Sequence, residues 1–175
     1  MEKKLFKFEL IGFIFTGILG TLNHFLFEWL NNSVFIGTFC PVNESIWEHQ
    51  KLLFFPYAIW LIIEYFILKK PKNFFLPKLA GITCGIIFTT AFYYTYTGIF
   101  GKESMVLDII SFFLGIGAAF LISYLMIKNL KNENKTVENI SVFLLIFIGI
   151  LFVAFTFSPP FIPLFKDPVT STYGI

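Results

Sequence analysis

The stretch FELIGFIFTGILGTLNHFLFEW, residues 8–29, decides the fold of this chain. It is apolar over most of its length, and it is long enough for an α-helix that crosses a bilayer, which takes roughly 20 residues. Four further apolar runs follow, at residues 52–68, 79–100, 105–127 and 141–157. The sequence therefore predicts an all-α bundle of five transmembrane helices, built as one domain over residues 1–175 and ending in a tail at 158–175.

The composition agrees with a membrane protein. Hydrophobic residues make up 57% of the chain, charged residues make up 14%, and the mean hydropathy is +0.78. Soluble domains have nearly half apolar and about a quarter charged residues. These values exclude a soluble enzyme domain, a nucleic-acid-binding module, a disordered chain and a large extramembrane domain. The lipid bilayer is the one partner that they predict, and they leave open any small-molecule, ion or protein partner.

The lysines predict the orientation of the chain. Three lie in the N-terminal segment, four lie at residues 69–78 and three lie at residues 128–140, whereas the alternate segments hold one each. Lysine-rich loops of membrane proteins are cytoplasmic. We therefore expect the N-terminus inside and the C-terminus outside, in a multi-pass protein of the cell membrane, which we take to be the bacterial cytoplasmic membrane.

Polar side chains gather in the outer half of the first predicted helix, at Asn23, His24 and Glu28. At about 100° per residue, His24 and Glu28 share one helix face as i,i+4 neighbours. Gly17 and Gly20 lie on the same face, and membrane helices approach one another along stripes of small residues. We therefore expect this histidine and this glutamate to point into the bundle.

Glu9 and Glu64 lie near the predicted inner surface, within a turn or two of lysines. Side chains near the ends of membrane helices can extend to the headgroups. Both carboxylates are therefore expected at the membrane interface.

The loop PVNESIWEHQK at residues 41–51 has the pattern of a helix start. Asn43 is a good N-cap, and Glu44 then falls in the first turn, where the helix dipole favours a negative charge. If the helix begins there, Glu44 and Glu48 lie within about 60° of each other, whereas His49 lies about 100° from Glu48. The pattern predicts that the two glutamates serve one site and that His49 lies at its edge.

Three interpretations of these polar residues remain open. In the first, His24, Glu28, Glu44 and Glu48 bind zinc or another divalent cation, because imidazole and carboxylate ligands suit that ion. A catalytic form of this site would use Glu48 or Glu44 as general base and His49 as proton shuttle, on a lipid or peptide near the outer leaflet.

In the second interpretation, the carboxylates carry a proton or a cation along a transport path. In the third, they form a purely structural network in a partner subunit, with Glu48 and Lys51 as an i,i+3 ion pair and His24 hydrogen-bonded to Glu28. Under each interpretation we expect the same further residues to border an outward-facing pocket: Asn23, Asn43, Lys51, Tyr96, Asp108 and Asp167. Tyr96 is a candidate hydrogen-bond donor to the acidic groups there.

The chain resembles a family of small bacterial multi-pass membrane proteins known as a domain of unknown function. The residues that carry the resemblance are Asn23-His24, the motif Pro-Val-Asn-Glu-Ser-x-Trp-Glu-His-x-Lys at 41–51, and Leu-Phe-Lys-Asp-Pro-x-Thr-x-Thr-Tyr-Gly-Ile at 164–175. The resemblance implies an integral membrane protein and no particular activity, substrate or cofactor. The apolar, turn-rich tail is expected to pack as a lid over the pocket or to adhere to the membrane surface.

Overall fold

The computed structural model describes residues 2–69, 72–130 and 134–175, and these residues are almost entirely helical. The helices are α1 (Glu2–Trp29), α2 (Val34–Gly37), α3 (Ile46–Ile67), α4 (Phe75–Phe100), α5 (Met105–Asn129) and α6 (Lys135–Phe157), followed by the 3₁₀ turn η1 (Pro163–Phe165). Five of them are long and apolar enough to cross a membrane. The predicted all-α fold is confirmed for the described residues, and so is the presence of five long apolar helices that could span a membrane. The orientation of the termini stays a prediction.

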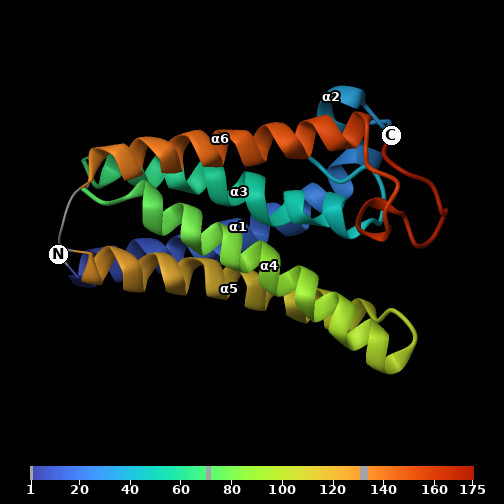
Figure 1. Ribbon diagram of the computed structural model, residues 1–175, viewed down its shortest axis with the longest axis horizontal. Helices are drawn as coiled ribbons and strands as arrows, with labels where there is room; N and C mark the ends of the chain where they lie inside the picture. The colour runs from blue at the N-terminus through green and yellow to red at the C-terminus, as the bar shows by residue number, and fades with distance from the viewer. Residues whose placement is uncertain (1, 70–71, 131–133) are drawn as a thin grey trace.

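The five long helices run side by side, and the two ends of the chain lie at opposite ends of the bundle (Figure 1). α1 packs on α3 and α5, α4 packs on α5 and α6, and α3 packs on α4 and α6. The α4–α5 hairpin diverges from the other helices toward the turn that joins α4 to α5 (Figure 1). This divergence lies at the end of the bundle where the C-terminal segment folds back.

Glycines set the close contact between α4 and α5. A Cβ added at Gly81 would lie 2.3 Å from the carbonyl oxygen of Ala119, and one added at Gly85 would lie 2.8 Å from that of Gly115. Both distances are far below van der Waals contact, so only glycine lets the two backbones approach this closely.

The outward faces of the bundle are apolar. Large hydrophobic side chains are exposed along the helices, among them Ile18 on α1, Leu121 on α5 and Phe143 on α6. Such faces suit contact with lipid tails, and together with the five long helices they indicate a multi-pass membrane protein.

The expectation that Glu9 and Glu64 reach the membrane interface is wrong. Both carboxylates are buried inside the bundle, where each forms an ion pair with Lys78 of α4. Nearby lysines in the sequence suggested a surface position, but the cation that pairs with both glutamates comes from a helix distant in sequence from Glu9. Lys78 itself is fully buried in the first turn of α4 and is not a free loop lysine.

Candidate functional site

Three potential metal ligands meet at the end of the bundle where the C-terminal segment folds back. They are His24 of α1, Glu44 of the loop before α3, and His49 of α3, and we call them the histidine cluster. The Nε2 atoms of His24 and His49 lie 3.2 Å apart. Glu44 Oε2 lies 3.4 Å from His49 Nε2 and 4.0 Å from His24 Nε2. Both imidazoles are partly buried, whereas the Glu44 side chain is half exposed.

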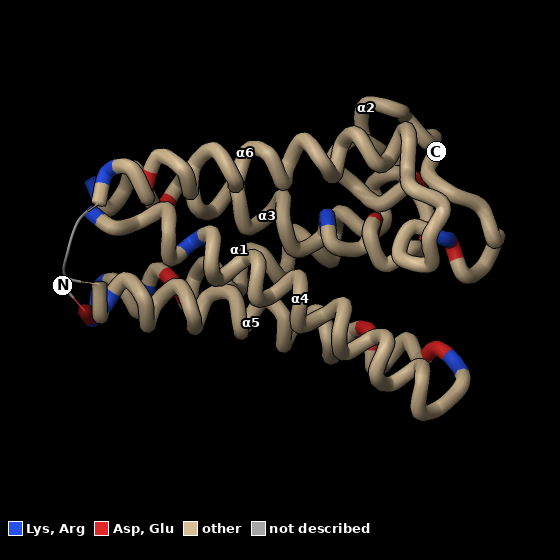
Figure 2. The backbone as a smooth tube through the Cα atoms, in the orientation of Figure 1, with Lys and Arg blue, Asp and Glu red and all other residues tan. Residues whose placement is uncertain are grey.

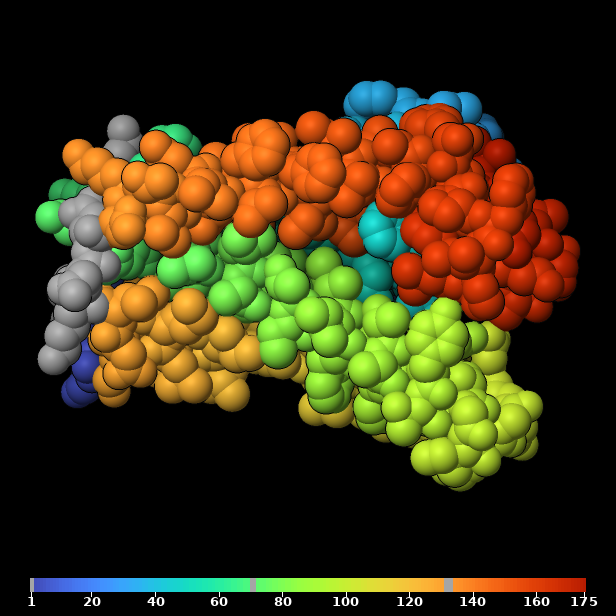
Figure 3. All heavy atoms as spheres, viewed as in Figure 1, coloured from blue at the N-terminus to red at the C-terminus, as the bar shows by residue number. Residues whose placement is uncertain are grey.

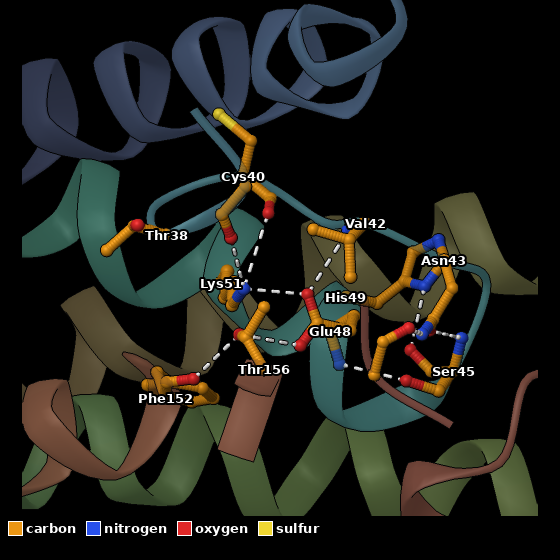
Figure 4. Close-up of polar contacts among 12 residues, drawn as sticks. Thr38, Cys40, Val42, Asn43, Ser45, Glu48, His49, Lys51, Phe152 and Thr156 are labelled. Carbon is orange, nitrogen blue, oxygen red and sulfur yellow. Dashed lines mark hydrogen bonds and ion pairs between the residues drawn. The ribbon is translucent and has the colours of Figure 1, made fainter. Parts of the chain in front are cut away.

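The local structure before α3 orients this cluster. Asn43 Oδ1 accepts a hydrogen bond from the Ser45 backbone N–H at 2.9 Å, and Ser45 Oγ accepts one from the Glu48 backbone N–H at 3.3 Å. Ser45 is therefore the N-cap, and α3 begins at Ile46. Figure 4 shows these contacts at the start of α3.

The hydrogen bonds of His49 fix its tautomer. Its Nδ1 lies 3.0 Å from the carbonyl oxygen of Ser45 (Figure 4). Because a carbonyl can only accept, Nδ1 carries the proton, and the Nε2 of the neutral ring keeps a lone pair. That lone pair faces the Nε2 of His24, which then donates to it. A backbone contact of this kind also orients histidines that bind metals.

Glu48 belongs to a different network. Its Oε2 lies 2.7 Å from Lys51 Nζ and accepts from the Val42 backbone N–H at 3.1 Å, and its Oε1 accepts from Thr156 Oγ1 at 3.0 Å (Figure 4). The i,i+3 ion pair of Glu48 and Lys51 was expected as one alternative, and it is present. Lys51 Nζ also donates to the carbonyl oxygens of Gly37 and Cys40, at 2.8 and 3.3 Å. This network attaches the α2 segment to α3.

Glu44 therefore lies with His49 and not with Glu48. The predicted common face of the two glutamates required a helix that already included Glu44, but the helix begins two residues later. Glu28 also lies outside the cluster, on the exposed last turn of α1. Asn23, the residue directly before His24, is buried on α1.

A cavity of about 570 Å³ opens beside the cluster, and its volume is typical of a site for a small ligand. Its walls come from α1, α3, α4, α5 and the tail, and they are mostly apolar, with Leu53 and Phe112 among the lining side chains. Val169 of the tail borders the cavity. Figure 3 shows the surface hollowed between α4 and the C-terminal segment. Tyr93 lines both the cavity and a smaller groove of about 270 Å³ that α4 and the tail also border.

Polar groups of the cavity wall are already hydrogen-bonded, either to one another or to a residue such as Tyr96 that is not among the lining residues. Asp108 Oδ1 accepts from the Tyr96 hydroxyl at 2.6 Å, as the sequence suggested for that tyrosine. The sequence analysis missed Gln50 and Thr89, which both line the cavity, with Thr89 Oγ1 donating to Gln50 Oε1 at 2.9 Å.

The tail stabilises the loop that carries Glu44. Asp167 is buried, and its carboxylate accepts hydrogen bonds from the Val169 N–H at 2.8 Å and from Thr170 Oγ1 at 2.6 Å. Burial opposes ionisation, but these bonds and another from the backbone N–H of Glu44 outweigh it and lower the pKa of Asp167 below its usual value. Asn43 Nδ2 donates to the Gly174 carbonyl oxygen at 3.0 Å. The tail therefore packs on the loop next to the cavity.

The whole chain matches one protein family. No curated protein and no solved structure matches the chain. The model of a family of unknown function, DUF6512, matches residues 1–175. A match over this full length identifies the chain as a member of DUF6512.

Proposed function

We propose that this protein binds a divalent cation, with zinc as the best candidate, at His24, Glu44 and His49, and that the metal acts on a substrate held in the cavity. The observation that carries the proposal is the spacing of the three ligand atoms. Tetrahedral zinc with bonds of roughly 2.0–2.1 Å sets its ligand atoms about 3.3–3.4 Å apart. Two of the separations, 3.2 and 3.4 Å, are within about 0.2 Å of this value.

The third separation, 4.0 Å between His24 and Glu44, needs only a small movement. Glu44 can supply that movement, because its side chain is half exposed and lies in a loop. The tautomer of His49 supports metal binding as well, since its Nε2 lone pair faces the other two ligands. His24 would take the matching tautomer, with its proton on Nδ1.

The ligand set supports a catalytic site rather than a closed structural one. Two imidazoles and one carboxylate leave the fourth position of a tetrahedral zinc ion for water. Zinc lowers the pKa of such a water to roughly 7, which makes hydroxide available at neutral pH. All three ligands border the cavity, so this water would meet a bound substrate.

Asp108 is our candidate for the general base, in place of Glu48 and its neighbour His49. Lys51 and two further donors occupy the carboxylate of Glu48, and His49 is assigned to the metal. Asp108 borders the same cavity as His49 and Glu44. The hydrogen bond from Tyr96 holds its carboxylate in place.

The cavity favours an amphiphilic substrate. Its lining is mostly apolar, whereas the metal cluster and Asp108 form a polar part. A lipid or an acylated peptide would place its chain among the apolar side chains and its ester, amide or phosphoester bond at the metal. Such a substrate fits a multi-pass membrane protein whose helices contact lipid.

Metal binding by the purified protein tests the proposal. Detergent-purified wild type, dialysed against zinc, should retain about one zinc per chain. We expect His49→Ala or Glu44→Gln to weaken zinc binding by more than the roughly 10–100-fold seen when an outer-shell partner is lost. Glu28→Gln is the matched control, because Glu28 lies outside the cluster on the exposed end of α1. Metal-free wild type, or equal loss in the control, would overturn the proposal.

A further inference from the structure

A second cluster, which unlike the histidine cluster is fully buried, lies at the other end of the bundle, and we call it the Lys78 triad: Glu9 of α1, Glu64 of α3 and Lys78 of α4. Lys78 Nζ lies 2.8 Å from Glu9 Oε1 and 2.6 Å from Glu64 Oε2. The three side chains are between 0 and 4% exposed. In Figure 2 the charged positions concentrate toward the two ends of the bundle.

The charges of the triad do not balance. With both glutamates ionised, two carboxylates face one ammonium and leave a net charge of −1. Among residues 2–69, 72–130 and 134–175, the other groups with a hydrogen bond to the triad are neutral: Ser123 of α5 donates to Glu9 Oε1 at 2.9 Å, and Tyr57 of α3 donates to the Lys78 carbonyl oxygen at 3.2 Å. Uncompensated charge is unfavourable inside a membrane protein. One bound proton would make the triad neutral.

The carboxylate oxygens give a second, independent observation. Glu9 Oε2 and Glu64 Oε1 are buried and have no hydrogen-bond partner within the described ranges. An ionised carboxylate accepts hydrogen bonds at both oxygens, so each of these glutamates lacks half of the contacts that its charged form requires.

We propose that the Lys78 triad is a proton-binding site that holds one labile proton, shared between Glu9 and Glu64, at neutral pH. The ammonium of Lys78 lies between the carboxylates and stabilises whichever of them is ionised. A proton fits here better than a sodium ion, since a metal cation needs several oxygen ligands and the triad offers two unpartnered oxygens.

Polar atoms along α1 lead from the triad toward the middle of the bundle. Trp60 Nε1 and Thr16 Oγ1 are also buried without a partner in the part of the chain that the structure describes. Trp60 Nε1 lies against Gly12, so the positions 9, 12 and 16 follow one another at helical spacing on one face of α1. These atoms mark the direction in which water or a proton could approach Glu9.

Infrared difference spectroscopy of the folded protein tests the proposal, because a protonated carboxyl group has its own C=O band. Wild type at neutral pH should show one protonated buried carboxyl per chain. Either Glu9→Gln or Glu64→Gln should abolish it, since one carboxylate then balances one ammonium. Lys78→Gln should raise the count to two. Glu28→Gln, at the opposite end of α1, should leave it at one.

Several outcomes would overturn the inference. Wild type without a protonated carboxyl at neutral pH does so alone, and this result requires no variant to fold. A band that survives in both glutamine variants assigns the proton elsewhere. A band that sodium removes at constant pH shows that the site binds sodium in preference to a proton. The infrared band of the triad does not depend on zinc binding at the histidine cluster. Either proposal, the proton site or the zinc site, can therefore be refuted without the other.

Discussion

Replacing Lys51 by methionine should leave the carboxylate of Glu48 buried without its cation. The Lys51 side chain is 0% exposed and that of Glu48 is 2% exposed, and Nζ lies 2.7 Å from Oε2. Removing one partner of a buried ion pair costs roughly 3–5 kcal/mol, because the remaining charge is uncompensated. Lys51→Met also removes the donor to the carbonyl oxygens of Gly37 and Cys40, so we place the loss near the upper end of that range.

The double variant Glu48→Gln/Lys51→Met separates the charge from the hydrogen bonds. It leaves no buried charge, and the amide oxygen of glutamine can still accept from Thr156. We therefore expect it to be less destabilised than the sum of the two single variants by about 1–3 kcal/mol, the coupling typical of residues in contact. The single variant Glu48→Gln leaves the buried ammonium of Lys51 without a counter-charge. It should therefore be less stable than the double variant.

Denaturant titration in lipid–detergent micelles, followed by circular dichroism, measures these free energies of unfolding. Zinc affinity of the folded Glu48→Gln protein is read in parallel, and it should change by less than the roughly 10-fold that marks an outer-shell partner. A loss below about 1 kcal/mol for Lys51→Met, or strict additivity, would refute the structural role. If the folded Glu48→Gln protein no longer bound zinc, Glu48 would have to be counted among the metal ligands.

Two further predictions concern the tail and the helix contact. The lowered pKa of Asp167 means that its ionised form favours the folded tail above the ordinary aspartate pKa of about 4, and that this contribution is lost as the pH falls through the folded value. Asp167→Asn should therefore cost about 1–3 kcal/mol at pH 7 and progressively less as the pH falls below about 4, as measured by melting temperature and by proteolysis of the tail. Gly81→Val should destabilise the bundle by several kcal/mol, because its Cβ would lie 2.3 Å from the carbonyl oxygen of Ala119, whereas Gly98→Ala, with nothing within 4 Å, should be neutral. Similar melting temperatures for the two glycine variants would contradict the close approach of α4 and α5.

The spanning helices could be predicted from the sequence because spanning depends on local properties, namely length and hydropathy. Small residues on the same face of α1 predicted that His24 and Glu28 both point into the bundle, but only His24 is partly buried, whereas Glu28 is exposed. Spacing within one helix gives the face on which a residue lies, but it does not tell how far along the helix the neighbouring helices still cover that face, and Glu28 lies on the last turn of α1.

The composition of the histidine cluster could not be predicted in this way. Asn43 and Ser45 are both good capping residues, and a difference of two residues in the helix start decides whether Glu44 lies with Glu48 or with His49. The Lys78 triad was missed for a related reason. Its three residues come from three helices, and no pattern within one helix reports such a contact.

X-ray absorption at the zinc edge of the zinc-loaded protein identifies the atoms that bind the metal. If His24, Glu44 and His49 hold the zinc, we expect two imidazole nitrogens at roughly 2.0–2.1 Å and one or two oxygens at about 2.0–2.2 Å, from Glu44 and water. His24→Ala should reduce the imidazole contribution to one ring, and Glu28→Gln should leave the spectrum unchanged. A first shell of water oxygens without imidazole, or one with sulfur at roughly 2.3 Å from a cysteine, would contradict the assignment of the metal to this cluster.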